Sequence, residues 1–216
     1  MLVAEIDETE PNEPSADDKI PRTERGRRTA RKLIDAAALE FGEHGFHDAS
    51  ITGITRRAGT ALGSFYTYFS SKEEIFHALV EDLTCKVVET SAIEDEPARP
   101  MLDREREISL RYLAFAREHK EIYRIIDQCE FVEPEGFRNR YELIAQRIFE
   151  RLQDGIARGE LRSDLTEAHA WAIMGMSSML GLRYGSWGSD ESLDEIADIA
   201  NSLLRNGIAL PQGEAD

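Results

Sequence analysis

The sequence has few cysteines and no long apolar run. It contains two cysteines in 216 residues, Cys85 and Cys129, which stand far apart without a CxxC pair. Disulfide frameworks and zinc sites need denser spacing, so we interpret both as small buried apolar side chains in a reducing compartment. No segment approaches the roughly 20 apolar residues that cross a bilayer, and the acidic N-terminus is unlike a secretory signal. These absences predict a soluble, cytoplasmic protein.

Motifs that carry enzymatic chemistry are absent as well. The sequence has no phosphate-binding GxxxxGK[ST] loop, no GxSxG nucleophile motif and no HExxH zinc motif. His119 and His169 are isolated, and His44 and His47 straddle a predicted helix end, so none has metal-ligand spacing. We therefore expect no enzyme, no metal site and no cofactor.

The net charge of -16 is unevenly distributed. Residues 1–18 hold seven acidic and no basic residues, whereas residues 19–72 hold ten basic and five acidic residues. A basic block within an acidic chain predicts a single docking face for phosphate, with repulsion elsewhere. Residues 1–20 lack the apolar residues needed to fold, so we expect a disordered acidic arm that either solubilises the chain or competes with DNA.

Apolar residues recur at three- and four-residue steps from Thr29 onward, which predicts an all-α protein of about nine helices. Ser70 to Glu73 predict a capping box, in which the side chains of Ser70 and Glu73 bond each other's backbone amides. Pro134 to Gly136 predict a turn. After the arm at residues 1–20, we expect two domains, at residues 21–72 and 73–210. The expected helices are residues 30–41, 50–58, 61–69, 70–87, 102–119, 122–129, 137–158, 166–184 and 193–208.

Residues 46–73 predict a helix-turn-helix. Two short helices joined by a turn at Gly59 place the second helix, residues 61–68, in a major groove while the first braces it across the backbone. Small polar residues and glycine on the outward side of this recognition helix allow close approach to bases. Leu62 and Phe65 are expected to brace it from behind.

This stretch resembles the TetR family of transcription regulators. The run from Ala58 to Glu74 is similar to the family signature A-G-V-x-x-G-x-[LF]-Y-x-[YH]-F-x-[SN]-K-E-[ED], and the similarity extends over about 50 residues. The rest of the chain resembles the family only in its helix count and final helix pair. The matching residues upstream of the signature are Leu33, Ala36, Ala37, Phe41, Gly45, Phe46 and, at a usual threonine position, Ser50.

The resemblance implies an N-terminal DNA-binding domain and a larger helical domain that binds a ligand and forms a homodimer. The residues it implies for contacts with phosphate or thymine methyl groups are Ser50, Thr52, Tyr66, Tyr68 and Lys72. Base recognition is assigned to Thr60, Ala61, Gly63, Ser64 and Thr67. Arg25, Arg27 and Arg28, just ahead of the first helix, are placed to reach a minor groove or the backbone. Packing alone is the alternative role for Tyr66.

Three positions depart from the family pattern and leave the operator preference open. Thr60 replaces the usual valine, Thr55 replaces alanine, and Gly53 stands where a charged residue is common. Glycine inside a helix costs roughly 1 kcal/mol relative to alanine, so we expect a weakened second helix.

The two final helices carry stripes of small and apolar residues that predict a four-helix dimer interface about a twofold axis. Ordinary packing within one chain is the alternative. The expected interface residues are Gly175, Ser178, Met179, Leu182, Leu193, Ile196, Ala197, Ala200, Leu203 and Leu204.

Aromatic residues on apolar helix faces between the two ends predict a cavity for an apolar ligand with one polar group. Each of these residues can instead belong to an ordinary core. The expected lining residues are Tyr112, Phe115, Tyr123, Tyr141, Phe149, Trp171 and Met174, with Cys129 beside them.

The favoured hypothesis is a one-component repressor that a small, largely apolar effector releases from a palindromic operator. The alternative is a helical ligand-binding or protein-interaction module that has lost DNA affinity, which the acidic net charge favours.

Overall fold

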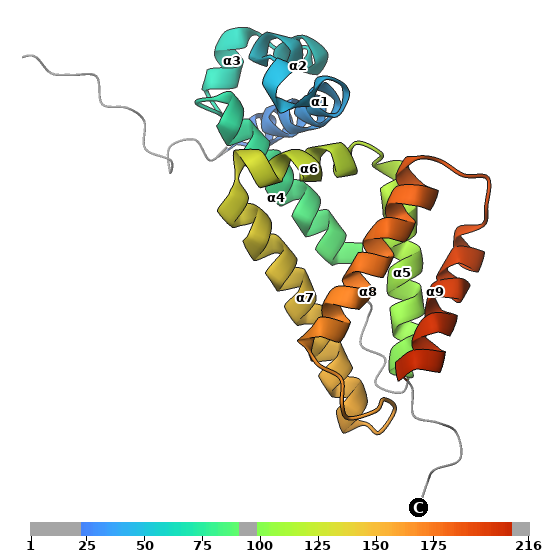
Figure 1. Ribbon diagram of the computed structural model, residues 1–216. Coiled ribbons are helices and arrows are strands. Elements are labelled where there is room, and N and C mark those ends of the chain that lie inside the picture. Colours follow the sequence, from blue (N-terminus) through green and yellow to red (C-terminus); the bar gives the residue numbers. More distant parts are fainter. Residues whose placement is uncertain (1–22, 91–98, 209–216) are drawn as a thin grey trace, which may run out of the picture.

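Helices make up most of residues 23–90 and 99–208, which are the parts of the chain described by this computed structural model (Figure 1). The all-α prediction is confirmed, while the expected acidic arm lies outside the described residues. The helices are α1 (Glu24–Asp48), α2 (Ile51–Ala58), α3 (Leu62–Tyr66), α4 (Lys72–Thr90), α5 (Met101–Glu118), α6 (Ile122–Val132), α7 (Pro134–Ala157), α8 (Glu167–Leu180), the π-helical turn η2 (Gly181–Ser186) and α9 (Leu193–Ile208).

Helix α1 begins well before the first apolar repeat. The side chain of Thr23 accepts a hydrogen bond from the backbone amide of Gly26 at 3.1 Å and so caps the helix. The expected start near residue 30 was wrong because the first two turns are solvated and carry no apolar period. Near the other end, Gly45 breaks the helical geometry with a φ of 79°, a conformation that glycine adopts without strain.

Phenylalanine rings fill the space between α1, α3 and α4. Phe76 lies edge-on to Phe41 and Phe46, with ring centroids 5.2 and 5.0 Å apart. Phe41, Phe65 and Phe76 are completely buried. We call α1, α2, α3 and the first turns of α4 the DNA-binding region, and this aromatic core makes it a single packed unit.

Helix α4 begins one residue later than the capping box predicts. The hydroxyl of Ser71 accepts from the amide of Glu74 at 3.2 Å. The carboxylate of Glu74 in turn accepts from the amide and hydroxyl of Ser70, each at 2.5 Å. The box therefore joins Ser70 and Ser71 to Glu74, and the predicted pairing of Ser70 with Glu73 was wrong.

Helix α6 lies across the end of α1 and joins it to the remaining helices (Figure 1). The guanidinium of Arg124 donates to the carbonyl oxygens of Gly42 and Glu43 at 2.6 and 2.8 Å. The side chain of Gln128 accepts from the backbone amide of Phe46. A side chain at Gly42 would approach Glu121 to 2.7 Å, so the two helices touch at a glycine.

The remaining helices form a bundle below this junction. Helix α5 runs through it and packs against α9 and η2, while α7 packs against α8 (Figure 1).

Two expectations were wrong in this bundle. Pro134 is the first residue of α7 rather than part of a turn, a position where proline loses no hydrogen bond. Gly185 and Ser186, which lie beyond the expected helix end at residue 184, continue α8 as the last residues of η2. Among the described residues, no helix is long and apolar enough to cross a membrane.

Candidate functional site

Helices α2 and α3 form the expected helix-turn-helix. The hydroxyl of Ser50 caps α2 by accepting from the amide of Gly53 at 3.0 Å. Gly59 ends α2 in the left-handed conformation, with a φ of 64°, which turns the chain toward α3. Helix α3 spans only Leu62–Tyr66, so the recognition helix is shorter than the expected residues 61–68.

The outer side of α3 presents small residues and one tyrosine. Ala61, Gly63, Tyr66 and Thr67 are exposed, and nothing lies within 4 Å of a Cβ built on Gly63. Phe65 braces the helix from behind as expected. Such a surface lets a helix backbone come close to base edges.

Two side chains of this segment lie differently from the prediction. Leu62 was expected behind the helix, but 44% of its surface is exposed, because the short helix turns this residue toward solvent. The hydroxyl of Thr60 is buried and lacks a hydrogen-bond partner among the described residues, so this oxygen is not presented to a base. Tyr68 is half-buried against the aromatic core, whereas Ser64 is partly exposed.

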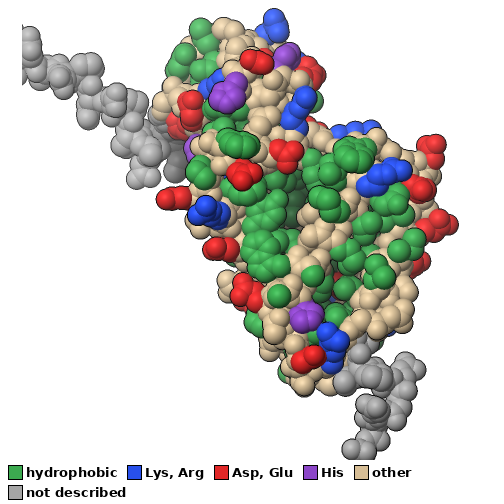
Figure 2. Space-filling model, viewed as in Figure 1, with side chains coloured by type: hydrophobic (Ala, Val, Ile, Leu, Met, Phe, Trp, Pro, Cys, Tyr) green, Lys and Arg blue, Asp and Glu red, His purple; other side chains and the backbone are tan. Residues whose placement is uncertain are grey.

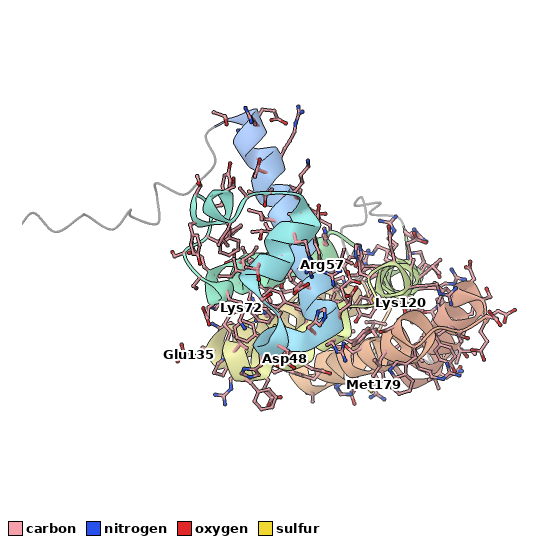
Figure 3. The ribbon with its side chains drawn as sticks, turned by 90° about the horizontal axis from the view of Figure 1, so that it is seen from above. Asp48, Arg57, Lys72, Lys120, Glu135 and Met179 are labelled. Carbon is pink, nitrogen blue, oxygen red and sulfur yellow. The ribbon has the colours of Figure 1, made fainter. Side chains whose placement is uncertain are left out.

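Lys72 links α4 to the end of α1. Its ammonium donates to the carbonyl oxygens of His47 and Ala49, each at 3.0 Å, and lies 4.7 Å from the centre of the Phe46 ring. Figure 3 labels Lys72 close to Asp48 at the end of α1. Two of the three ammonium protons thus serve the fold, which leaves one for the phosphate contact that the sequence predicts.

The three arginines expected ahead of the first helix lie inside it. Arg25, Arg27 and Arg28 are exposed in the first turns of α1. Arg27 and Arg28 both pair with the carboxylate of Glu24, at 2.9 and 3.2 Å. They therefore project from a helix rather than from an extended arm, and this placement corrects the prediction.

A buried carboxylate that sequence reasoning missed supports α2 from behind. Glu40 of α1 is 4% exposed, and its Oε2 accepts from Nε of Arg57 at 2.6 Å. Arg57 also binds Glu43 through its two terminal nitrogens, and these hydrogen bonds lower the pKa of Glu43. A Cβ at Gly53 would stand 1.9 Å from the Glu40 carboxylate. Gly53 is thus the place where that carboxylate passes α2 to reach Arg57, which Figure 3 labels.

A cavity of about 120 Å³ lies among α4, α5, α6, α7 and α8. Figure 2 shows hydrophobic side chains gathered around a hollow between α7 and α8. The lining residues are Val80, Leu83, Thr84, Val87, Tyr112, Ile122, Ile125, Ile126, Cys129, Phe137, Arg140, Tyr141, Ile144, Met174, Ser177 and Ser178.

Comparison with known proteins agrees with the helix-turn-helix. The family model "Bacterial regulatory proteins, tetR family" matches residues 33–79. The uncharacterised HTH-type transcriptional regulator YdgC of Bacillus subtilis is 30% identical over 194 residues, which are 88% of this chain and 96% of YdgC. The chain belongs to the TetR family. It is a DNA-binding transcriptional regulator.

Other TetR-family relatives extend the likeness. The repressor KstR2 of Rhodococcus jostii is 29% identical over 208 residues, 92% of this chain and 98% of KstR2. The crystal structure of FadR from Bacillus subtilis, in complex with stearoyl-CoA, has a TM-score of 0.67 at 19% identity and covers 82% of this chain and 98% of that one. The FadR likeness concerns the fold alone.

The expected ligand residues fall into two groups in this TetR-family fold. Tyr112, Tyr141, Met174 and Cys129 line the cavity, whereas Tyr123, also expected there, does not line it and instead shares a hydrogen bond with Tyr112. The remaining three expectations were wrong, because an apolar helix face can serve a core or the surface as well as a cavity. Phe115 belongs to the core beside α1, Phe149 packs at the far end of α7, and Trp171 is 40% exposed.

The tyrosines of the cavity form a hydrogen-bonded chain. The Tyr123 hydroxyl donates to the Ser178 carbonyl at 2.9 Å and lies 2.8 Å from the Tyr112 hydroxyl, which must therefore be the donor to Tyr123. Burial raises the pKa of all three phenols, Tyr112, Tyr123 and Tyr141. Burial also raises the pKa of the Cys129 thiol to about 11, so the cavity keeps these groups neutral.

Several lining residues escaped the sequence analysis, above all Arg140. Arg138, Asn139 and Glu142 surround Arg140 in the sequence, and these polar neighbours gave no signal of an inward position. The aliphatic residues of α4 and α6 were recognised as apolar faces without any sign that a hollow separates them. Only their distances across the bundle reveal the cavity.

The expected dimer surface is divided between the interior and the exterior. Gly175, Met179 and Leu203 are exposed, while Leu182 is half-buried and Ser178 lines the cavity. Both faces of α9 carry apolar residues. The inner face was assigned to the dimer contact from the sequence, but that face packs against the same chain. The residues that pack there are Leu193, Ile196, Ala197, Ala200 and Leu204.

Proposed function

We propose that this regulator is a homodimeric repressor that a small, largely apolar effector releases from a palindromic operator. Residues 21–72 form its DNA-binding domain, and residues 73–210 form its effector-binding and dimerisation domain. The observation that carries the proposal is the apolar cavity, whose walls α4 and α6 both pack against α1.

The two walls offer a physical route from effector to DNA. Helix α4 supplies Leu83 and Val87 to the cavity, and its first residue, Lys72, holds the end of α1. Helix α6 supplies Ile125, while its Arg124 binds carbonyls of α1. An effector that prefers a wider spacing of these helices shifts the population toward conformers that no longer fit the operator. FadR, solved with stearoyl-CoA, supports a search among ligands with apolar parts.

The outer face of α8 and α9 is the proposed contact with a second copy. Met179 of α8 is 61% exposed, and Ile199 and Leu203 of α9 are 57% and 64% exposed. Trp171 adds an exposed ring, and Gly175 leaves room for close approach. Aromatic and methionine side chains are enriched at such interfaces. Leu203→Glu is therefore expected to produce monomers in analytical ultracentrifugation, with operator affinity reduced.

A matched pair of variants tests the role of the cavity. Ile144 lines the cavity, and its neighbour Leu143 is exposed on the same helix. A metabolite screen by thermal stabilisation, followed by operator-release assays, identifies an effector. Ile144→Trp is expected to abolish both responses while operator binding persists, whereas Leu143→Trp retains them. Retained effector response in Ile144→Trp contradicts the proposed site.

The acidic net charge of -16 favours one alternative, a ligand-binding or protein-interaction module without DNA affinity. A mobility-shift titration on the DNA flanking its own gene separates the two. We expect binding that weakens as salt increases. Absence of binding even at low salt supports the alternative.

A further inference from the structure

Arg140 is the exception in an otherwise uncharged cavity. Among the described residues that line it, Arg140 supplies the single charged group, and no carboxylate is present. Nη1 of Arg140 donates to Oε1 of Glu133 at 3.1 Å. Nη2 is buried and has no oxygen or nitrogen partner among the described residues, and the guanidinium lies beside the neutral Cys129 thiol. A cationic donor thus borders an apolar hollow with part of its binding capacity unused.

The Glu133 carboxylate shares one hydrogen bond with Arg140. Its second oxygen, Oε2, lies 2.7 Å from Nδ1 of His77 in α4, a contact that is an ion pair only when His77 is protonated. A guanidinium is planar and suited to two parallel hydrogen bonds to one carboxylate, yet here it makes a single such bond. Leaving a charged donor buried and unpaired costs free energy, which an incoming acceptor recovers.

We infer that the cavity takes an apolar monocarboxylate whose carboxylate binds Arg140 and whose chain lies among the aliphatic residues of α4 and α6. This inference rests on the proposed effector site and names its ligand class. One partly buried cation matches one negative charge. The small volume and the predominance of apolar lining side chains favour a short hydrocarbon chain over a large polyanion.

The same contact places the ligand next to a link between helices. Glu133 stands just before α7 and bridges Arg140 of α7 to His77 of α4. A bound carboxylate competes with Glu133 for Arg140 and therefore weakens the hold of α7 on α4. The charge of the ligand thus acts on α4, whose first residue, Lys72, lies in the DNA-binding region.

Three probes of equal chain length separate charge from apolar contact. Octanoate, octanol and octylamine share the hydrocarbon part and differ in the head group, and calorimetry gives their dissociation constants. We expect octanoate to bind at least about 10-fold more tightly than octanol, the range of a hydrogen bond to a charged group, and octylamine to bind least. Octanoate is also expected to reduce operator affinity at concentrations where octanol does not.

Variants of the arginine complete the test. Arg140→Gln is expected to weaken octanoate about 10-fold and to leave octanol within about twofold, so the octanol value also reports an intact cavity. Arg138→Gln removes an exposed arginine of the same helix and is the matched control. Glu133→Gln is expected to strengthen octanoate binding several-fold because it removes a competing negative charge.

Each contrary result has a distinct meaning. Equal binding of octanoate and octanol, or unchanged octanoate binding in Arg140→Gln, overturns the inference while the apolar effector site stands. Failure of all three probes to bind contradicts the inference and the proposed effector site together. Tighter binding of octylamine than of octanoate likewise overturns the assignment of a negative ligand.

Discussion

The DNA-binding region and the helices around the cavity fill their interiors in opposite ways. Between α1, α3 and α4, stacked and edge-on phenylalanine rings occupy the space, and Phe41, Phe65 and Phe76 have no exposed surface. Among α4 to α8, aliphatic side chains surround a hollow of about 120 Å³. A close-packed interior moves as one body, whereas a hollow one can change its shape when a ligand fills it.

Helix α4 takes part in both interiors, the aromatic core of the DNA-binding region and the wall of the cavity. Its first half contributes Phe76 to the aromatic core, and its second half contributes Leu83 and Val87 to the cavity wall. A change in the hollow part therefore reaches a unit that is too tightly packed to absorb it internally. In the proposed mechanism the DNA-binding region then rotates or shifts as a whole, which alters the distance between the two recognition helices of the proposed dimer.

The largest expected effect is loss of an aromatic ring from the packed region. Phe41→Ala is expected to lower the free energy of unfolding by about 3–5 kcal/mol. The ring is completely buried, and the neighbouring rings keep the space that it leaves from closing. Leu39→Ala, on the exposed side of the same helix, should change it by less than about 0.5 kcal/mol. Urea denaturation measures both, and a small effect at Phe41 would show that this core is as adaptable as the cavity.

The next effect concerns Gly53, where helix propensity and packing make opposite predictions. Alanine ordinarily stabilises a helix relative to glycine by roughly 1 kcal/mol. Here a Cβ would stand 1.9 Å from the Glu40 carboxylate, which is buried and held by Arg57. We expect Gly53→Ala to destabilise the protein by about 1–3 kcal/mol, because the carboxylate must leave its partner or α2 must move.

Gly63 provides the matched control for this substitution. A Cβ at Gly63 meets nothing within 4 Å, so Gly63→Ala should leave thermal stability unchanged or slightly raised. Its effect should instead be on operator affinity, since the residue lies exposed on α3. Stabilisation by Gly53→Ala would mean that the packing of α2 on α1 yields easily.

A smaller effect is expected at Lys72, which serves both fold and DNA contact. Lys72→Ala removes two hydrogen bonds to α1 and should cost about 1–2 kcal/mol of unfolding free energy. It should also weaken binding to all DNA and reduce the salt dependence by about one phosphate contact. Ser64→Ala, by contrast, is expected to change base preference without a loss of stability. Equal losses of affinity for both variants across operator sequences would contradict these roles.

The sequence was sufficient for part of the local structure. Gly59 and Phe65 have the predicted positions because a left-handed turn and a buried ring are properties of a few neighbouring residues. It was insufficient where two apolar faces compete. Ile196 and Leu203 both lie on α9 at helical spacing, and only the position of α5 decides that Ile196 is inside and Leu203 outside.

Long-range pairs were beyond sequence reasoning for the same reason. Glu40 contacts Arg57 across 17 residues of sequence, and nothing in either helix alone marks these two charges as partners. Without Glu40, Gly53 looked like a defect of α2, whereas it provides the space that this carboxylate requires. The cavity is likewise a property of helix spacing, so its residues were recognisable as apolar but not as lining.

The two cysteines of the TetR-family chain offer the mildest test of the comparison between the packed and the hollow interior. Their alkylation rates report on solvent access to the cavity without a substitution in the chain. Cys85 is exposed on α4, so the prediction that it is buried was wrong, whereas Cys129 lines the cavity and has its pKa raised to about 11 by burial. Since the thiolate is the reacting form, iodoacetamide at pH 8 should alkylate Cys85 at least roughly 100-fold faster than Cys129. Mass spectrometry of the modified peptides gives both rates, with Cys85 as the internal control. Comparable rates would mean that the hollow region opens to solvent readily, and protection of Cys129 by octanoate would then report how a ligand closes it.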